Sequence, residues 1–240
     1  MWKYAQGSET MLRYFYRSRR KKGFTLVELI VVIAIVGVLA GIIIPIVSGY
    51  VQKAKNANDK LMGKEIYNSV MNLIAEDREA WKAFHQITSG YQHLTEWIAT
   101  DDGYADPKQF GNGKSPKDGE YKIVVVAKMD GAKAIDKAAF AWLNGNKEQY
   151  DFILRLNMKL GLWDASGNLT DKAKDMQNHG DYLYKMKATS HSDGKNTDRW
   201  LICYQKDNPS AIEIWTGDSF SAGRSGTTYR IYPDPCIEYE

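Results

Sequence analysis

The sequence predicts an α+β protein in which a long amino-terminal helix, apolar over its first half, packs on an antiparallel β-sheet head with inserted helices. Three observations carry this prediction. An apolar tract near the amino end runs directly into an amphipathic helical pattern. Short strand-like runs separated by turn residues follow toward the carboxyl end. Separate helical patterns interrupt them.

The composition excludes several classes of protein. The chain has 240 residues, of which 44% are hydrophobic and 25% charged, so it is not disordered, collagen-like or of low complexity. Residues 1–23 hold seven Lys or Arg and one Glu, a net +6, so the remaining 217 residues carry −3 of the total +3. This balance argues against nucleic acid as the main partner. Two cysteines are too few for a disulfide scaffold or a four-thiolate zinc site.

The apolar tract predicts a membrane span. Residues 26–47 read LVELIVVIAIVGVLAGIIIPIV, long enough to cross a bilayer as a helix. Basic residues at 19–22 precede it, which predicts a single-pass precursor in the cytoplasmic membrane with its amino end inside and the chain after Val47 outside. A conventional cleaved signal is disfavoured because residues 48–56 contain no A-x-A cleavage pattern.

Two features of this tract are unusual for a passive anchor. Glu28 places a carboxylate in an apolar helix, where charge is costly. It could snorkel to the membrane edge, or it could pair with a positive group of a neighbouring chain. Gly37 and Gly41 form a GxxxG pair, which either lets helices approach closely or reflects the abundance of glycine in membrane helices. The sequence leaves both choices open.

The junction at residues 21–29, KKGFTLVEL, resembles the type IV pilin and pseudopilin family, whose precursors carry class III signal peptides. The family pattern is a basic leader ending in glycine, then phenylalanine, with a glutamate at the fifth position after the cut. Gly23, Phe24 and Glu28 match it, and Pro45 matches the family's helix-bending proline. The resemblance covers the leader and the apolar tract.

The resemblance implies a processing route and a set of partners. A prepilin peptidase would cut after Gly23 and remove the leader 1–23, and the new Phe24 amine would be methylated. In a filament, Glu28 would face the Phe24 amine of the adjacent subunit, and the expected partners are other pilins, the peptidase, the assembly platform and the membrane. The leader is longer than usual for the family, and Met11 offers a second possible start that leaves the mature chain unchanged.

The helix is expected to run over residues 24–75, with 24–47 as the transmembrane and filament-core part. Past the tract, apolar side chains recur at helical spacing and predict a face that packs on the exported head, residues 76–240. Pro45 and Gly49 are expected to bend or loosen the helix where its halves meet. The face consists of Val51, Ala54, Ala57, Met62, Ile66, Val70 and Leu73.

The head reads as mixed helix and strand. Its loops are expected at 101–119 and 163–170, with Thr170 as a helix N-cap and a hairpin turn at 207–210. The segment 132–160 is helical beyond what the family's minimal head requires, so it is expected to be an insertion. Helices are predicted at 76–88, 91–100, 132–143 and 147–160, and strands at 121–128, 182–187, 200–206, 211–216 and 227–232.

The two cysteines admit two states. The family often closes its carboxyl-terminal loop with a disulfide, so the resemblance implies a Cys203–Cys236 bridge, which an exported head could keep. The alternative is two buried thiols.

The sequence contains no pattern that predicts catalysis, a cofactor or a metal. No two histidines have the i, i+4 spacing of a helical zinc site, and no G-x-S-x-G, P-loop or Rossmann glycine pattern occurs. Three hypotheses follow: a structural pilus subunit; a pseudopilin or minor pilin of a type II secretion or DNA-uptake machine; and a tethered extracellular enzyme or receptor. The last leaves Glu28 unexplained.

Overall fold

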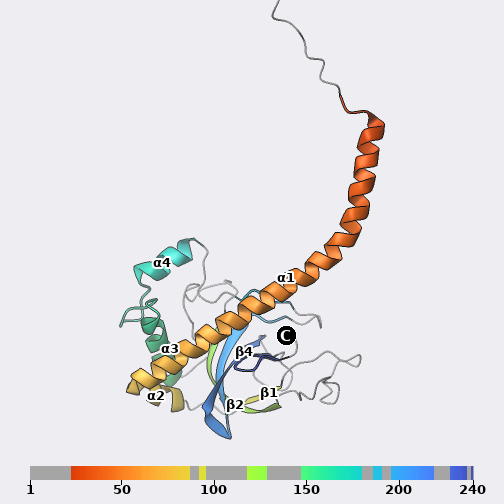
Figure 1. The fold of residues 1–240 in the computed structure, drawn as a ribbon. Helices are drawn as coiled ribbons and strands as arrows, with labels where there is room; N and C mark the ends of the chain where they lie inside the picture. Colours follow the sequence, from red (N-terminus) through yellow and green to blue (C-terminus); the bar gives the residue numbers. More distant parts are fainter. Residues whose placement is uncertain are drawn as a thin grey trace, which may run out of the picture. The chain divides into compact units, whose positions relative to one another are not determined.

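The computed structural model describes residues 23–86, 92–95, 118–128, 147–179, 186–190, 196–218, 228–236 and 239 (Figure 1). The chain divides into two compact units, Met1–Ser48 and Gly49–Glu240. The helices are α1 (Leu26–Glu76), α2 (Arg78–His85), α3 (Lys147–Lys159) and α4 (Asp171–Asn178). The strands are β1 (Gln92–Thr95), β2 (Asp118–Lys128), β3 (Arg199–Gln205), β4 (Asn208–Gly217) and β5 (Thr228–Tyr232).

The five strands form one sheet in the order β1-β2-β3-β4-β5, and every neighbouring pair is antiparallel. The second half of α1 lies across one face of this sheet (Figure 1). A close approach fixes this packing at Gly63, which is buried against Ile231 of β5. The predicted α+β arrangement of a long helix on an antiparallel sheet, with further helices, is therefore confirmed.

Both faces of the sheet are buried. Along β3, Trp200, Ile202 and Tyr204 belong to the core that α1 covers, whereas Leu201 and Cys203 belong to a second cluster. This split follows from the alternation of side chains along a strand. The second cluster consists of Leu94, Tyr121, Ile123, Leu201, Cys203 and Trp215.

The disulfide expected between Cys203 and Cys236 is not formed, and both are buried thiols. Cys203 lies in the second cluster, and Cys236 lies in the core that α1 covers. The physical reason is therefore that the sheet separates them. The Sγ of Cys203 contacts the Glu213 carbonyl oxygen at 3.6 Å.

The face of α1 that packs on the head was predicted correctly only in part. Ile66, Val70 and Leu73 are buried as expected. Val51, Ala54 and Ala57 are exposed, because the buried stripe begins at Asp59 and continues through Gly63.

Most predicted head elements are present with shifted ends. Helix α3, the Thr170 N-cap of α4, and strands β2, β3, β4 and β5 are confirmed. The helix predicted at 91–100 is wrong at residues 92–95, which pair with β2 as strand β1. The hairpin turn spans residues 205–208 around Lys206 and Asp207, two residues earlier than the expected 207–210. Of the strand predicted at 182–187, residues 186 and 187 are not strand. The rest of it, the helix at 132–143 and residues 101–117 of the loop expected at 101–119 lie outside the described residues. Residues 118 and 119 of that loop belong to β2 instead.

Asp59 is a fully buried carboxylate that fastens a distant segment to α1. It accepts hydrogen bonds from the backbone amides of Lys187 and Ala188, both at 2.8 Å. Burial raises the pKa of Asp59 to about 6, although these two hydrogen bonds oppose the increase. The loss of hydration therefore outweighs the hydrogen bonds, so Asp59 binds its proton more tightly in the folded chain than in the unfolded chain.

Asp59 should make the chain more stable as the pH falls from about 7 to about 3, because the folded state takes up its proton near pH 6 and the unfolded state near 3.8. The gain should reach at most about 3 kcal/mol. We expect Asp59→Asn to lack this component in urea unfolding of the detergent-solubilised chain followed by tryptophan fluorescence. Identical pH dependence in the two proteins would contradict it.

Gly63→Ala should destabilise the fold by about 1–3 kcal/mol, because the added Cβ would overlap the Cγ2 methyl of Ile231. Alanine elsewhere in a helix usually stabilises relative to glycine. Gly49→Ala is the matched control, since nothing lies within 4 Å of a Cβ there. Ile231→Leu removes the Cγ2 branch and should rescue Gly63→Ala in the double variant, as measured by thermal unfolding. Equal stability of the two glycine variants would refute the close-approach explanation.

Candidate functional site

The predicted site begins with a short segment that precedes α1. Gly23, Phe24 and Thr25 have no regular secondary structure, and α1 starts at Leu26. The Phe24 side chain is 86% exposed. Within the described residues the backbone of Gly23 and Phe24 makes no helical hydrogen bond, and a backbone of this kind that is open to solvent is a suitable substrate for a peptidase.

Glu28 closes a capping box at the start of α1. Its Oε2 accepts hydrogen bonds from the backbone N–H and the hydroxyl of Thr25, at 2.8 and 2.9 Å. In return the Glu28 N–H donates to the Thr25 hydroxyl oxygen at 3.2 Å. Thr25 and Glu28 therefore satisfy each other's backbone donors, which otherwise have no partner in the first turn of a helix.

Glu28 was expected to have only a membrane-edge or an intermolecular role, and this capping box adds a third role within its own helix. The signal was present, because T-x-x-E before an apolar run is typical of a helix start. A carboxylate in the first turn also faces the positive end of the helix dipole. Within the described residues the other oxygen, Oε1, accepts no hydrogen bond. Glu28 can thus cap its own helix and still offer an oxygen to a second donor.

The remaining predicted assembly residues lie along α1. No described atom approaches within 4 Å of a Cβ placed at Gly37 or Gly41, so both present open helix surface. Pro45 lies inside α1 and has no N–H for the carbonyl four residues before it. Ser48 donates its hydroxyl to the Pro45 carbonyl oxygen at 2.8 Å. These residues therefore shape the surface and the local hydrogen bonding of the tract at a distance from the junction at residues 21–29.

The tract is long and apolar enough to cross a membrane, and none of its most apolar window is buried. Sixteen large aliphatic side chains between residues 26 and 47 are about half exposed or more. Such a surface needs lipid or other apolar helices around it.

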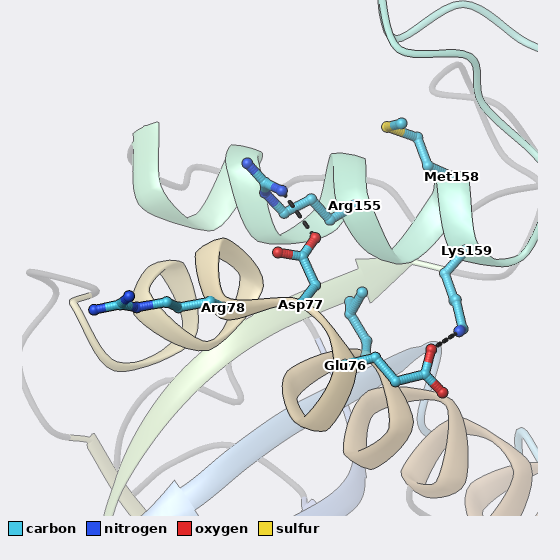
Figure 2. Close-up of a pocket in the computed structure, with 7 residues that line it drawn as sticks. Glu76, Asp77, Arg78, Arg155, Met158 and Lys159 are labelled. Carbon is cyan, nitrogen blue, oxygen red and sulfur yellow. Dashed lines mark hydrogen bonds and ion pairs between the residues drawn. The ribbon is translucent and has the colours of Figure 1, made fainter.

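A pocket of about 450 Å³ lies where α1 ends, α2 begins and α3 passes (Figure 2). Asp77 caps α2 by accepting from the Glu79 and Ala80 amides, and it also accepts from Arg155 at 2.8 Å. Burial alone would raise the pKa of Asp77, but these hydrogen bonds outweigh burial and lower it. Glu76 forms an ion pair with Lys159. These two ion pairs join the end of α1 and the start of α2 to α3, so the two acids of the pocket are best explained as attachment points for α3.

Among the described residues, no three His, Cys, Asp or Glu side chains converge in a group that could bind a metal ion. His85 contacts the Trp81 carbonyl oxygen at 2.8 Å, and His179 lies beside Asp175. His93 and His191 lie outside the residues whose side chains the structure describes.

A comparison with family models identifies the junction. Residues 18–44 match the prokaryotic N-terminal methylation motif. This is the class III signal peptide of type IV pilins and pseudopilins, so the resemblance inferred from residues 21–29 is confirmed. The matched span includes the basic flank, Gly23, Phe24, Glu28 and most of the apolar tract. No curated protein and no solved structure matches the chain.

Thr25→Ala should loosen the start of α1 by about 1 kcal/mol, because the N-cap hydroxyl is lost. Amide hydrogen exchange at residues 26–29 should then be about fivefold faster in detergent micelles, as measured by mass spectrometry. Thr25→Ser keeps the hydroxyl and should exchange like the wild type. If Thr25→Ala exchanged no faster than Thr25→Ser, the capping box would not stabilise this turn.

Proposed function

We propose that the chain is a prepilin-like structural subunit of a type IV pilus or a related filament. It is cut after Gly23, methylated at the Phe24 amine and polymerised through α1. The observation that carries the proposal is the methylation-motif match at residues 18–44, which includes a carboxylate in the otherwise uncharged apolar tract 26–47. The motif and this helix indicate a membrane-anchored precursor.

Cleavage would create the charge that Glu28 needs. A new α-amine at Phe24 is a cation placed four residues before the acid. In a filament core, opposite charges attract strongly and an unpaired charge is penalised. Glu28 uses Oε2 for its own Thr25, so Oε1 is available for the amine of an adjacent subunit. This pairing would set the register between neighbouring copies.

The exposed tract would serve in turn as anchor and as filament core. In the membrane its aliphatic side chains face lipid, and in the filament they face other α1 helices. Open surface at Gly37 and Gly41 supports close helix approach during this exchange. The basic flank at 19–22 favours an amino end in the cytoplasm and a head outside, so the assembled product would be at the cell surface. The partners would be a prepilin peptidase, an assembly platform and other pilins.

A pseudopilin or minor pilin of a type II secretion or DNA-uptake machine is the second candidate. The observation that favours it is the additional helical part of the head, α3 and α4, of which α3 is joined to the α1–α2 junction through Asp77 and Arg155. A specialised head of this kind suits a component present in few copies. Labelled electron microscopy of native filaments would distinguish the candidates by subunit frequency. A tethered enzyme or receptor is less well supported, because it does not explain the methylation-motif match at residues 18–44.

The proposal predicts a processed amino end in the native protein. Mass spectrometry of the chain isolated from its own cells should find methylated phenylalanine at Phe24 as the first residue. A chain that still begins with its basic leader would overturn the proposal.

Glu28 variants separate the charge from the cap. Glu28→Gln keeps a side chain that can cap, whereas Glu28→Val removes both functions. Both should be cut normally but reduce sheared filament yield at least about tenfold, because the buried amine is left unpaired. Thr25→Ala is the matched control, since it loses the cap and keeps the charge, and it should assemble close to wild type. Normal filament yield from Glu28→Gln would exclude the charge pairing.

A further inference from the structure

A second apolar stripe runs along α1 just beyond the tract, within the Gly49–Glu240 unit. Its side chains are exposed, with Tyr50 at 69% and Leu61 at 64%. At about 100° per residue they fall within a sector of roughly 60°, so they form one continuous strip. We call it the outer stripe, and it consists of Tyr50, Ala54, Ala57 and Leu61.

The outer stripe points away from the head. The α1 residues buried against the sheet are centred about 170° around the helix from it. A helix that packs on one side alone is normally polar on the opposite side. Packing on the head therefore does not explain why this strip is apolar.

The spacing of the outer stripe is that of a coiled-coil seam. Successive members are four, three and four residues apart, which is the a/d pattern of a heptad. Alanines at the two central positions permit a close approach of backbones, and Tyr50 and Leu61 supply bulk at the ends. Lys64 takes the next seam position, so the strip ends there.

Lys60 and Glu65 beside the outer stripe suit a parallel pairing of two identical helices, and Lys64 of each copy would lie at the end of their shared seam. Lys60 and Glu65 lie on opposite edges of the strip and occupy the g and following e positions of this heptad. In a parallel, in-register pair, g of one helix lies beside e of the next heptad in its partner. Lys60 would then meet Glu65 of a second copy, twice by symmetry. Within the described residues, neither side chain makes an ion pair of its own.

We propose that the outer stripe docks a second copy of this chain, forming a parallel, in-register pair of α1 helices between membrane-held precursors. All copies in one bilayer are anchored by the same tract, and the stripe begins three residues after Val47, so the strips emerge at the same level. A two-fold contact closes on itself and cannot extend into a fibre. The pair is therefore a storage form, and it requires neither cleavage nor polymerisation.

Disulfide trapping tests the contact. The full-length chain with Ala57→Cys, placed in phosphatidylethanolamine–phosphatidylglycerol vesicles and mildly oxidised, should give a covalent dimer. The matched control is Lys55→Cys, which is also exposed but lies about 160° around the helix. Dimer should form at least about tenfold faster at position 57, because a disulfide needs Cβ atoms about 4 Å apart. Peptide mapping separates this bridge from the buried Cys203 and Cys236.

Charge reversal tests the register. Lys60→Glu and Glu65→Lys each place like charges in both symmetric pairs and should weaken association about threefold to tenfold. The double variant restores opposite charges and should recover wild-type association. Lys55→Glu is the control for net charge and should have little effect. Association is measured by energy transfer between labelled copies in the same vesicles.

Three outcomes would overturn the proposal: equal trapping at positions 57 and 55, no recovery in the charge-reversed double variant, or no energy transfer in the wild type. The last would indicate that lipid headgroups cover the strip. Because these vesicles contain no peptidase and no assembly platform, failure of filament formation would not alter the result. The pairing and the proposed function can therefore fail independently.

Discussion

Exposing the first half of α1 to water would cost a large amount of free energy, and most of what this chain does follows from that constraint. Sixteen large aliphatic side chains stand exposed between residues 26 and 47. At about 25 cal/mol per Å² of apolar surface, hiding them is worth tens of kcal/mol, more than the whole stability of a typical domain. The chain must therefore always place this segment in lipid or against other helices. A polar or charged group inside such a segment is tolerated only when its hydrogen bonds or its charge are satisfied.

Two acids on the same helix illustrate how differently this can be achieved. Glu28 sits at an exposed helix start and binds its own Thr25, so its partner is local and is available as soon as the first turn forms. Asp59 sits in the core and binds the amides of Lys187 and Ala188, which are 128 and 129 residues away. Its hydrogen bonds exist only when the whole head has folded. One acid therefore depends on local structure and the other on tertiary structure, although both carboxylates accept backbone N–H groups.

These two acids also mark what sequence reasoning could and could not find. The tract, the junction motif, the long helix and four of the five strands could be predicted, because each has a local pattern of apolar spacing or turn residues. The capping box was equally local, in the letters T-x-x-E, and could have been identified. Strand β1 could not, because its four residues become a strand by pairing with the edge of β2. Burial of Asp59 depends on a segment far along the chain. The cysteine pairing failed because strand alternation sets Cys203 on the opposite side of the sheet from Cys236.

The position of the capping box bears on the order of events at the amino end. Every hydrogen bond that initiates α1 comes from Thr25 or from residues after it, and none in the described part involves Gly23 or Phe24. Scission between those two residues would thus sever the polypeptide outside the helical framework. The apolar helix would keep its hydrogen bonds whether or not residues 1–23 are attached, so a cut at this bond would change the charge at the terminus without requiring any refolding.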